Sequence, residues 1–359
     1  MVHDLSPFLW QIKGDFGIRW YGLSYMLGFI VAYLLARWII QKQRMGLTID
    51  QLGDFATYCA IGTLVGGRLG YCLFYAPELF LQFKSSLPFW GVLAVNEGGM
   101  ASHGGIIGLV LTAIIYSKRT GIPPLYLCDL ICFGGTIGVG FGRIANFING
   151  ELIGRPASPG FPLAVKFPQD MYQWPATDTE RLSQIADVVA MVPGSEQYQQ
   201  ISREKWLELV SQYKVDPGAK AQVHYWIQAT IDAIQHGQQQ IKSAIEPFLI
   251  ARHPSQLYAA MSEGFLIFII LFLMWRNPRK PGVIGSWFLI LYSIGRVTNE
   301  MFRMPDAHIG FQLFGLTRGQ WLSIAMLISG FVCLFLFGNR SAFAVHGWGH
   351  DHSVRLHRK

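Results

Sequence analysis

Residues 142–155 concentrate the side chains of this chain that are best suited to chemistry. Within this run stand two arginines, one carboxylate and two carboxamides: Arg143, Arg155, Glu151, Asn146 and Asn149. The run follows an apolar stretch that reads as a membrane-spanning helix. Charged groups at the edge of a bilayer are costly unless they are paired or functional. A protein that only had to cross lipid would gain nothing from them, so the run predicts a functional site.

Two further arginines, Arg68 and Arg296, interrupt other apolar stretches. A guanidinium in such a place needs an anionic partner, and two kinds of partner are open. One is an internal carboxylate, for which the sequence offers Glu97, Asp129, Glu151 and Glu300. The other is a bound anion, in a membrane most commonly a lipid phosphate, which arginine grips with two parallel hydrogen bonds.

Tyr292, Arg296 and Glu300 recur at intervals of four residues, so they share one face of a helix. This polar stripe favours the anion pocket, although Arg296 and Glu300 can also pair within the helix. Tyr25 places a hydroxyl inside another apolar stretch, where it can donate to a ligand.

His103 stands at the start of an apolar stretch, between Ser102 and a pair of glycines. A neutral imidazole near a membrane surface is a natural base for a thiol or a hydroxyl. A purely structural histidine fits the spacing equally well. Ser255 and Gln256 open a later stretch, where capping of the helix explains them adequately.

Composition places the chain among membrane proteins. It is 51% hydrophobic and 14% charged, whereas soluble domains carry about a quarter charged residues. The net charge of +7 fits the Lys- and Arg-rich cytoplasmic loops of membrane proteins. Nucleic-acid binding is not expected, because the sequence has no basic stripe interleaved with aromatic residues outside the spans. The five cysteines, an odd number within apolar stretches, complete neither a disulfide framework nor a metal site.

The apolar pattern predicts an all-α membrane protein, a polytopic bundle of about seven transmembrane helices with one extracytoplasmic head domain. The expected spans are residues 20–40, 55–75, 104–116, 125–142, 258–275, 283–301 and 319–337. The stretch before the short third span reads as a buried loop at membrane depth. Gly134, Gly138 and Gly142 recur every fourth residue, as in close helix packing.

Lysine and arginine in the short loops set the expected orientation, with the N-terminus outside and the C-terminus in the cytoplasm. The chain then divides into helices one to four (1–148), an outer head (149–252), helices five to seven (253–338) and a cytoplasmic tail (339–359). Apolar residues at helical spacing between Val223 and Ile234 predict an amphipathic helix against the bundle or the lipid surface.

Taken together, these segments closely resemble the bacterial prolipoprotein diacylglyceryl transferases. The matching pieces, in order, are residues 19–25, 66–71, 102–108, 142–155, 252–258 and 296–306. The piece 142–155 is the family signature and is highly specific. The resemblance omits about 168–250 and the tail after Phe337. Ala259 stands where the family pattern leads us to expect a Glu, so we assign no role there.

The resemblance implies an enzyme of the bacterial inner membrane that moves a diacylglyceryl group from phosphatidylglycerol to the lipobox cysteine of a prolipoprotein. A thioether forms, glycerol phosphate leaves, and no metal or organic cofactor is implied. The implied catalytic residues are His103, Arg143, Arg296 and Tyr292. The implied substrate-binding residues are Tyr25, Asn146, Glu151, Gly154, Arg68, Glu300, Ser255 and Gln256.

Two other classes stay open on the residues alone. A transporter of an anionic lipid or solute would also use intramembrane arginines, but it usually carries an inverted repeat that this sequence does not display. A structural scaffold would leave residues 146–154 without a purpose.

Overall fold

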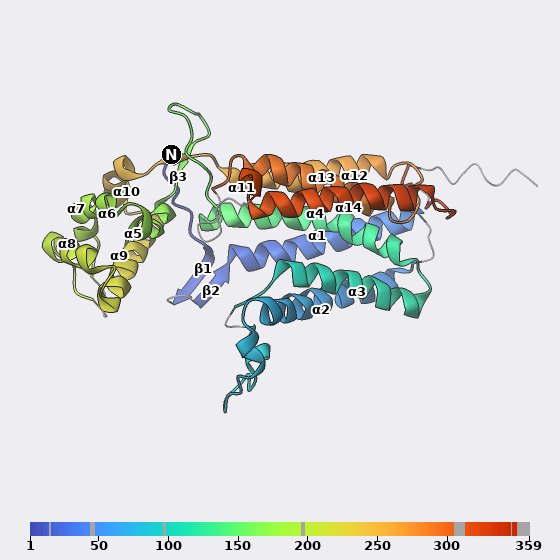
Figure 1. The fold of residues 1–359 in the computed structure, drawn as a ribbon, viewed down its shortest axis with the longest axis horizontal. Coiled ribbons are helices and arrows are strands. Elements are labelled where there is room, and N and C mark those ends of the chain that lie inside the picture. The colour runs from blue at the N-terminus through green and yellow to red at the C-terminus, as the bar shows by residue number, and fades with distance from the viewer. Residues whose placement is uncertain are drawn as a thin grey trace, which may run out of the picture. The chain divides into compact units, whose positions relative to one another are not determined.

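The computed structural model describes residues 1–13, 16–43, 47–95, 98–194, 198–304, 313–345 and 347–349. Contacts divide the chain into two compact units. The first comprises Met1–Met26, Gly140–Ser262 and Gly295–Trp321, and the second comprises Leu27–Val139, Glu263–Ile294 and Leu322–Lys359. Helices dominate both units, which confirms the predicted all-α membrane class (Figure 1).

Helices occupy all seven positions predicted to span the membrane. They are α1 (Trp20–Gln43), α2 (Ile49–Phe74), α3 (Ser102–Thr120), α4 (Pro124–Asn149), α11 (Ser255–Ala259) continued by a π-helical turn (Ala260–Phe265) and α12 (Leu266–Met274), α13 (Val283–Glu300) and α14 (Arg318–Asn339). Among the described residues, four helical stretches are long and apolar enough to cross a bilayer: Trp20–Gln43, Pro124–Asn149, Ser255–Met274 and Gly319–Asn339.

Glycine lets α2 and α3 lie side by side at backbone contact (Figure 1). A Cβ on Gly66 would lie 2.4 Å from the carbonyl oxygen of Gly104, and one on Gly108 would lie 2.0 Å from that of Gly62. Both distances are far inside van der Waals contact, so these positions accept only hydrogen. Gly104, which follows His103, is therefore needed for helix packing.

Two features of the second unit answer expectations from the sequence. Gly134 packs on Ala32, and Gly138 on Gly28, so close packing is confirmed for these glycines of α4.

Asp129 was a candidate partner for an arginine. That interpretation is wrong, because its buried carboxylate accepts hydrogen bonds from the amides of Gly282 (2.8 Å) and Gly285 (2.7 Å). Asp129 thus satisfies orphan N–H groups at the start of α13.

The segment between α4 and α11 forms a helical head inside the first unit. It contains strand β3 (Val165–Lys166), a 3-10 turn (Pro168–Tyr172), α5 (Trp174–Thr177), α6 (Thr179–Gln184), α7 (Ala186–Ala190), α8 (Arg203–Gln212), α9 (Pro217–Gln235), α10 (Gln239–Ile245), a second 3-10 turn (Glu246–Phe248) and β4 (Ala251–Arg252). β3 and β4 pair antiparallel, so the chain enters and leaves the head at one point.

The predicted amphipathic helix is present as α9, but its partner is not the one expected. Val223, Trp226 and Ile231 are buried in a core that the head builds for itself with Trp206 and Trp174. The apolar face of α9 therefore covers neither the bundle nor lipid.

The N-terminal segment adds short strands that the apolar pattern did not predict. β1 (Phe8–Lys13) and β2 (Phe16–Arg19) form an antiparallel hairpin ahead of α1. Ahead of the hairpin, Val2 forms a bridge with Lys166 of β3 and lies in the head core. The other short helical turns are Pro77–Phe80, Gly91–Leu93 and Leu313–Gly315.

The α2–α3 contact leads to a stability prediction. Gly66→Ala forces a methyl group onto the Gly104 carbonyl, and we expect a loss of about 1–3 kcal/mol through overpacking. Thermal unfolding in detergent micelles measures it. Gly53→Ala is the matched control, because open space surrounds this glycine of the same helix and alanine is the better helix former. Equal effects of the two changes would contradict the proposed contact.

Candidate functional site

The signature run ends in a loop, residues 150–155, which we call the signature loop. α4 ends at Asn149, and Gly150 turns the chain at a φ of 67°. The amide of Glu151 donates to the carbonyl of Asn146 (2.9 Å), which closes the helix end. Leu152 then adopts a φ of 52°, a conformation that is strained for a residue with a side chain. Surrounding contacts must therefore hold this loop in place.

The start of α11 holds one side of the signature loop. The hydroxyl of Ser255 donates to the carbonyl of Leu152 (3.0 Å), and the amide nitrogen of Gln256 donates to the carbonyl of Glu151. The capping explanation for these two residues is wrong, because Pro254 occupies the cap position and no side-chain hydrogen bond caps α11. Both side chains are buried. Their predicted contact with substrate stays a prediction.

The segment after α13 holds the other side. Gly154 forms an antiparallel bridge with Arg303, and the amide of Arg155 donates to the carbonyl of Phe302 (2.8 Å). The Arg155 guanidinium donates to the carbonyl of Arg303 (3.0 Å). A Cβ on Gly154 would lie 2.1 Å from the carbonyl oxygen of His253, so only glycine fits between the two flanking segments.

Arg296 and Glu300 form the intrahelical ion pair that the sequence left open as the alternative to an anion pocket. The guanidinium donates to one carboxylate oxygen of Glu300, and the Thr317 hydroxyl donates to the other (2.9 Å). The side chains are 14% and 7% exposed, so the pair is largely shielded from solvent. The carboxylate fixes the orientation of the Arg296 head group. Sequence reasoning missed Thr317, which is not a member of any matched motif.

The first turns of α1 bring aromatic hydroxyls to the same unit. The rings of Tyr21 and Tyr25 lie 5.2 Å apart, and their hydroxyls are hydrogen-bonded. Tyr21 also interacts electrostatically with Arg143 and Glu151. Tyr25 remains 53% exposed. Three predicted site residues, Tyr25, Arg143 and Glu151, therefore interact with Tyr21, to which the sequence analysis gave no role of its own.

Among several buried carboxamide oxygens of the first unit, two belong to predicted site residues and can accept a hydrogen bond. Within the described part of the chain, Oδ1 of Asn146 and Oε1 of Gln256 have no hydrogen-bond partner. Their residues are 5% and 2% exposed. A buried acceptor without a donor costs about 1–3 kcal/mol, so such groups call for a bound donor such as a ligand hydroxyl.

The second unit contains the other predicted site residues: Arg68, His103 and Tyr292. His103 is exposed on the first turn of α3. The buried Arg68 guanidinium donates to the carbonyls of Val92 (2.8 Å), Gly91 (2.7 Å), Gly98 (2.5 Å) and Gly99 (3.0 Å). It thus fixes the segment that leads into α3. The predicted role of Arg68 in substrate binding stays a prediction, as does that of Tyr292. Glu97 lies outside the described residues.

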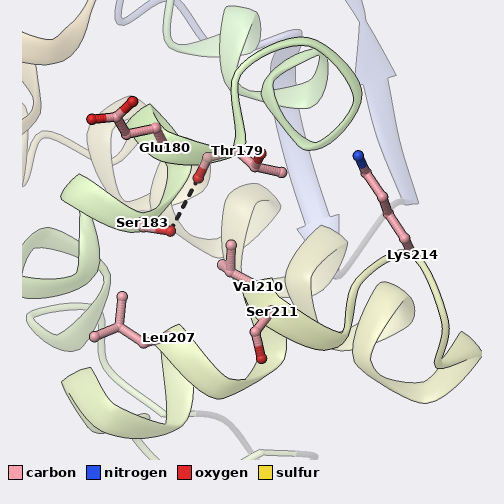
Figure 2. A pocket seen from close by; sticks show the side chains of 7 residues that line it. All are labelled: Thr179, Glu180, Ser183, Leu207, Val210, Ser211 and Lys214. Atoms are coloured by element: carbon pink, nitrogen blue, oxygen red, sulfur yellow. Dashed lines mark hydrogen bonds between the residues drawn. The ribbon is translucent and has the colours of Figure 1, made fainter.

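A cleft of about 430 Å³ in the head lies apart from these residues. It is lined by Thr179, Glu180, Ser183, Leu207, Val210, Ser211 and Lys214, which come from α6, α8 and the turn after α8 (Figure 2). The Ser183 hydroxyl donates to the carbonyl of Thr179 (3.0 Å). None of the predicted site residues lines this cleft.

His3 is buried between Phe147, at the end of α4, and Phe167, next to β3. Burial lowers the pKa of the imidazole from its ordinary 6.5 to about 4, against smaller opposing effects of the Phe147 backbone and the Asp4 carboxylate. The folded protein therefore carries a neutral ring here at neutral pH.

These features define a class of protein before any comparison. It is a polytopic membrane protein whose signature loop is held by hydrogen bonds to its backbone, in a compact unit that also contains Arg143, Arg296 and Tyr25. Comparison with known proteins then identifies the family. The profile of the family described as "Prolipoprotein diacylglyceryl transferase" matches residues 7–336, and the chain belongs to this family.

Relatives of similar length support this membership. A phosphatidylglycerol–prolipoprotein diacylglyceryl transferase of Bdellovibrio bacteriovorus is 55% identical over the whole of both chains. Enzymes of the same name from Nitrobacter winogradskyi and Neisseria gonorrhoeae are 32% and 33% identical over 92% and 94% of this chain, and over 88% and 97% of their own lengths. The predicted family is confirmed, and the chain is a membrane-bound transferase.

Gly154 provides the first test of the site. Gly154→Ala places a methyl group against the His253 carbonyl, and we expect it to displace the signature loop and lower transferase activity at least about 100-fold. Product formation on a thiol peptide in lipid vesicles is the measurement. Gly135→Ala is the control, since nothing lies within 4 Å of its Cβ position in α4. Wild-type activity of the Gly154 variant would show that the loop tolerates displacement.

His3 makes the docking of the N-terminus sensitive to pH. Its folded pKa lies below the unfolded value, so the stabilisation is complete above pH 6.5 and falls as the pH drops from 6.5 towards 4. We expect a loss of at most about 1.4 kcal/mol per pH unit in that window. Hydrogen exchange of the Lys166 amide, which donates to Met1, reports it.

His3→Phe should remove this contribution, whereas substitution of the exposed His236 by Asn should leave it unchanged. A pH dependence that persists in His3→Phe would assign the effect to another group.

Proposed function

We propose that this transferase moves the diacylglyceryl group of phosphatidylglycerol onto the thiol of the lipobox cysteine of a prolipoprotein. Sulfur attacks the glycerol carbon that bears the phosphate, the C–O bond breaks, and the electron pair leaves with glycerol phosphate. The product is a thioether. Family membership and the names of the relatives support this reaction.

The observation that carries the proposal is the way the signature loop is held. Hydrogen bonds from the start of α11 and from the segment after α13 fix its backbone on both sides. Attack at a saturated carbon needs no oxyanion hole, but it needs a leaving phosphate that is well stabilised. A rigid loop beside Arg143, with the Arg296 head group fixed by Glu300, fits that need. Preorganised charges stabilise a transition state without reorganisation during the reaction.

We assign the phosphodiester to Arg143 and Arg296, which would offset the charge that builds on the leaving oxygen. Tyr25 and Tyr292 would donate hydrogen bonds to the headgroup. The orphan Oδ1 of Asn146 would accept from a headgroup hydroxyl. Glu151, on the signature loop, would orient Arg143 or the terminal glycerol.

His103 would act as the base. A free thiol has a pKa of about 8.5, so it is mostly protonated at neutral pH and attacks slowly. A neutral imidazole that takes the thiol proton raises the thiolate fraction at the moment of attack. The exposed position of His103 at the start of α3 leaves its ring accessible to a substrate thiol.

We place the protein in the bacterial inner membrane, with its N-terminus and residues 149–252 outside and its C-terminus in the cytoplasm. Lysine and arginine in the loops after the first, third and fifth helices support this orientation. The donor lipid and the secreted precursor would then meet at the outer leaflet.

Two substitutions test the mechanism. His103→Gln removes the base, and Arg143→Ala removes a phosphate ligand, so each should lower thioether formation at least about 100-fold. Mass spectrometry of a lipobox peptide incubated in phosphatidylglycerol vesicles gives the measurement.

Arg203→Ala is the control, because this exposed arginine of the head pairs with Asp187 and is not among the predicted site residues. Size-exclusion chromatography and thermal unfolding verify that each variant is folded. Full activity of either variant would remove that residue from the mechanism, and a wild-type protein that forms no thioether would overturn the proposed function.

A further inference from the structure

Arg252 and Asp170 form a buried ion pair that neither the spacing of residues nor the family resemblance singled out. Nε of Arg252 donates to Oδ2 of Asp170 (3.1 Å), and Nη2 donates to both carboxylate oxygens (3.0 and 2.8 Å). The side chains are 6% and 3% exposed. This is the two-pronged geometry that arginine alone offers to a carboxylate.

The third nitrogen of the same guanidinium connects the pair to the signature loop. Nη1 of Arg252 donates to the carbonyl of Gly154 (3.1 Å). Asp170 belongs to the first turn of the head, and Arg252 ends β4, where its backbone also bridges Pro156. One planar group therefore joins the head to the loop.

Arg252 is the first of three residues in segment 252–256 whose side chains donate to the signature loop. Three and four residues later, Ser255 and Gln256 donate to the carbonyls of Leu152 and Glu151. Residues 252–256 thus hold three carbonyls of one loop whose backbone is strained at Leu152. Asp170 sets the plane of the Arg252 head group. That plane directs Nη1 of Arg252 towards the Gly154 carbonyl.

A buried ion pair is weak evidence for stability, because desolvation of both charges offsets most of their attraction. Apolar residues of equal volume would hold the head together equally well. They would not orient a donor towards Gly154. Orientation is therefore the property that this pair adds.

We propose that Arg252, oriented by Asp170, is a positioning residue for the transfer reaction, and this inference rests on the proposed function. Neither side chain is assigned to the substrate. The pair acts through the signature loop. By fixing the loop, it keeps Glu151 and the nearby Arg143 in position.

Arg252→Lys is the sharpest test. Lysine keeps the positive charge beside Asp170, but its single ammonium cannot satisfy both carboxylate oxygens and the Gly154 carbonyl in one plane. We expect kcat for thioether formation to fall at least about 10-fold while KM for phosphatidylglycerol changes less than about threefold, because small displacements mainly weaken transition-state contacts. Thermal unfolding of the head should stay within a few degrees of wild type.

Asp170→Asn is the second variant, and it should slow the reaction in the same way. The carboxamide keeps the shape of the carboxylate, but only one of its two terminal atoms can accept a hydrogen bond from Arg252. Arg203→Lys is the matched control, an exposed arginine paired with Asp187 on the same head. Its kcat and KM should equal those of the wild type.

Hydrogen exchange gives a readout that does not depend on activity. Amides 151–155 should exchange faster in Arg252→Lys, whereas amides of α9 in the head core should not change. Wild-type exchange in the loop would overturn the inference, whatever the activity.

A wild-type kcat in Arg252→Lys would also overturn it, as would a loss of activity that tracks loss of folded protein. Failure of the proposed function has a different signature, because the wild-type protein itself would then form no thioether.

Discussion

Backbone carbonyls just beyond the end of α4 lack the hydrogen bonds that a helix would give them, so other groups must donate to them. This constraint governs the structure around the signature loop. Hydroxyl, carboxamide and guanidinium groups donate to the carbonyls of Glu151, Leu152 and Gly154. All three donors come from one segment, 252–256, far along the chain. Because a carbonyl that is shielded from water costs free energy when it has no donor, these bonds favour the observed arrangement of the loop. The bonds that satisfy these carbonyls therefore also fix the course of the loop.

The sequence was sufficient for the helices, the family and most of the residues around the loop, because these depend on local patterns. Apolar stretches predicted helices at all seven expected spans, and the spacing of four residues allowed the pair of Arg296 and Glu300 as an alternative to an anion pocket. The partners of Ser255 and Gln256 could not be predicted in this way. Their acceptors lie 103 and 105 residues earlier, whereas local reasoning offered only the cap of their own helix.

Charge alone also gave incomplete answers. A carboxylate and an arginine in apolar stretches invite the prediction of ion pairs, yet Asp129 satisfies backbone amides instead, and Arg68 donates to backbone carbonyls. Periodicity cannot distinguish a charged from a peptide partner, because both satisfy the same hydrogen-bonding capacity. Asp170 gave no signal, since it lies in the segment that the resemblance leaves out and its partner, Arg252, was assigned no role. The apolar face of α9 was recognised correctly, but amphipathicity does not specify what covers it.

The place of Val2 and His3 in the head has a consequence for the order of folding. Four long helices separate these residues from their partners, Lys166 and Phe167, along the chain. Because Val2 lies in the head core, that core is complete only when this distant segment has joined it. Contacts between residues so far apart in the chain are slow to form. The core of the head is therefore expected to close late in folding.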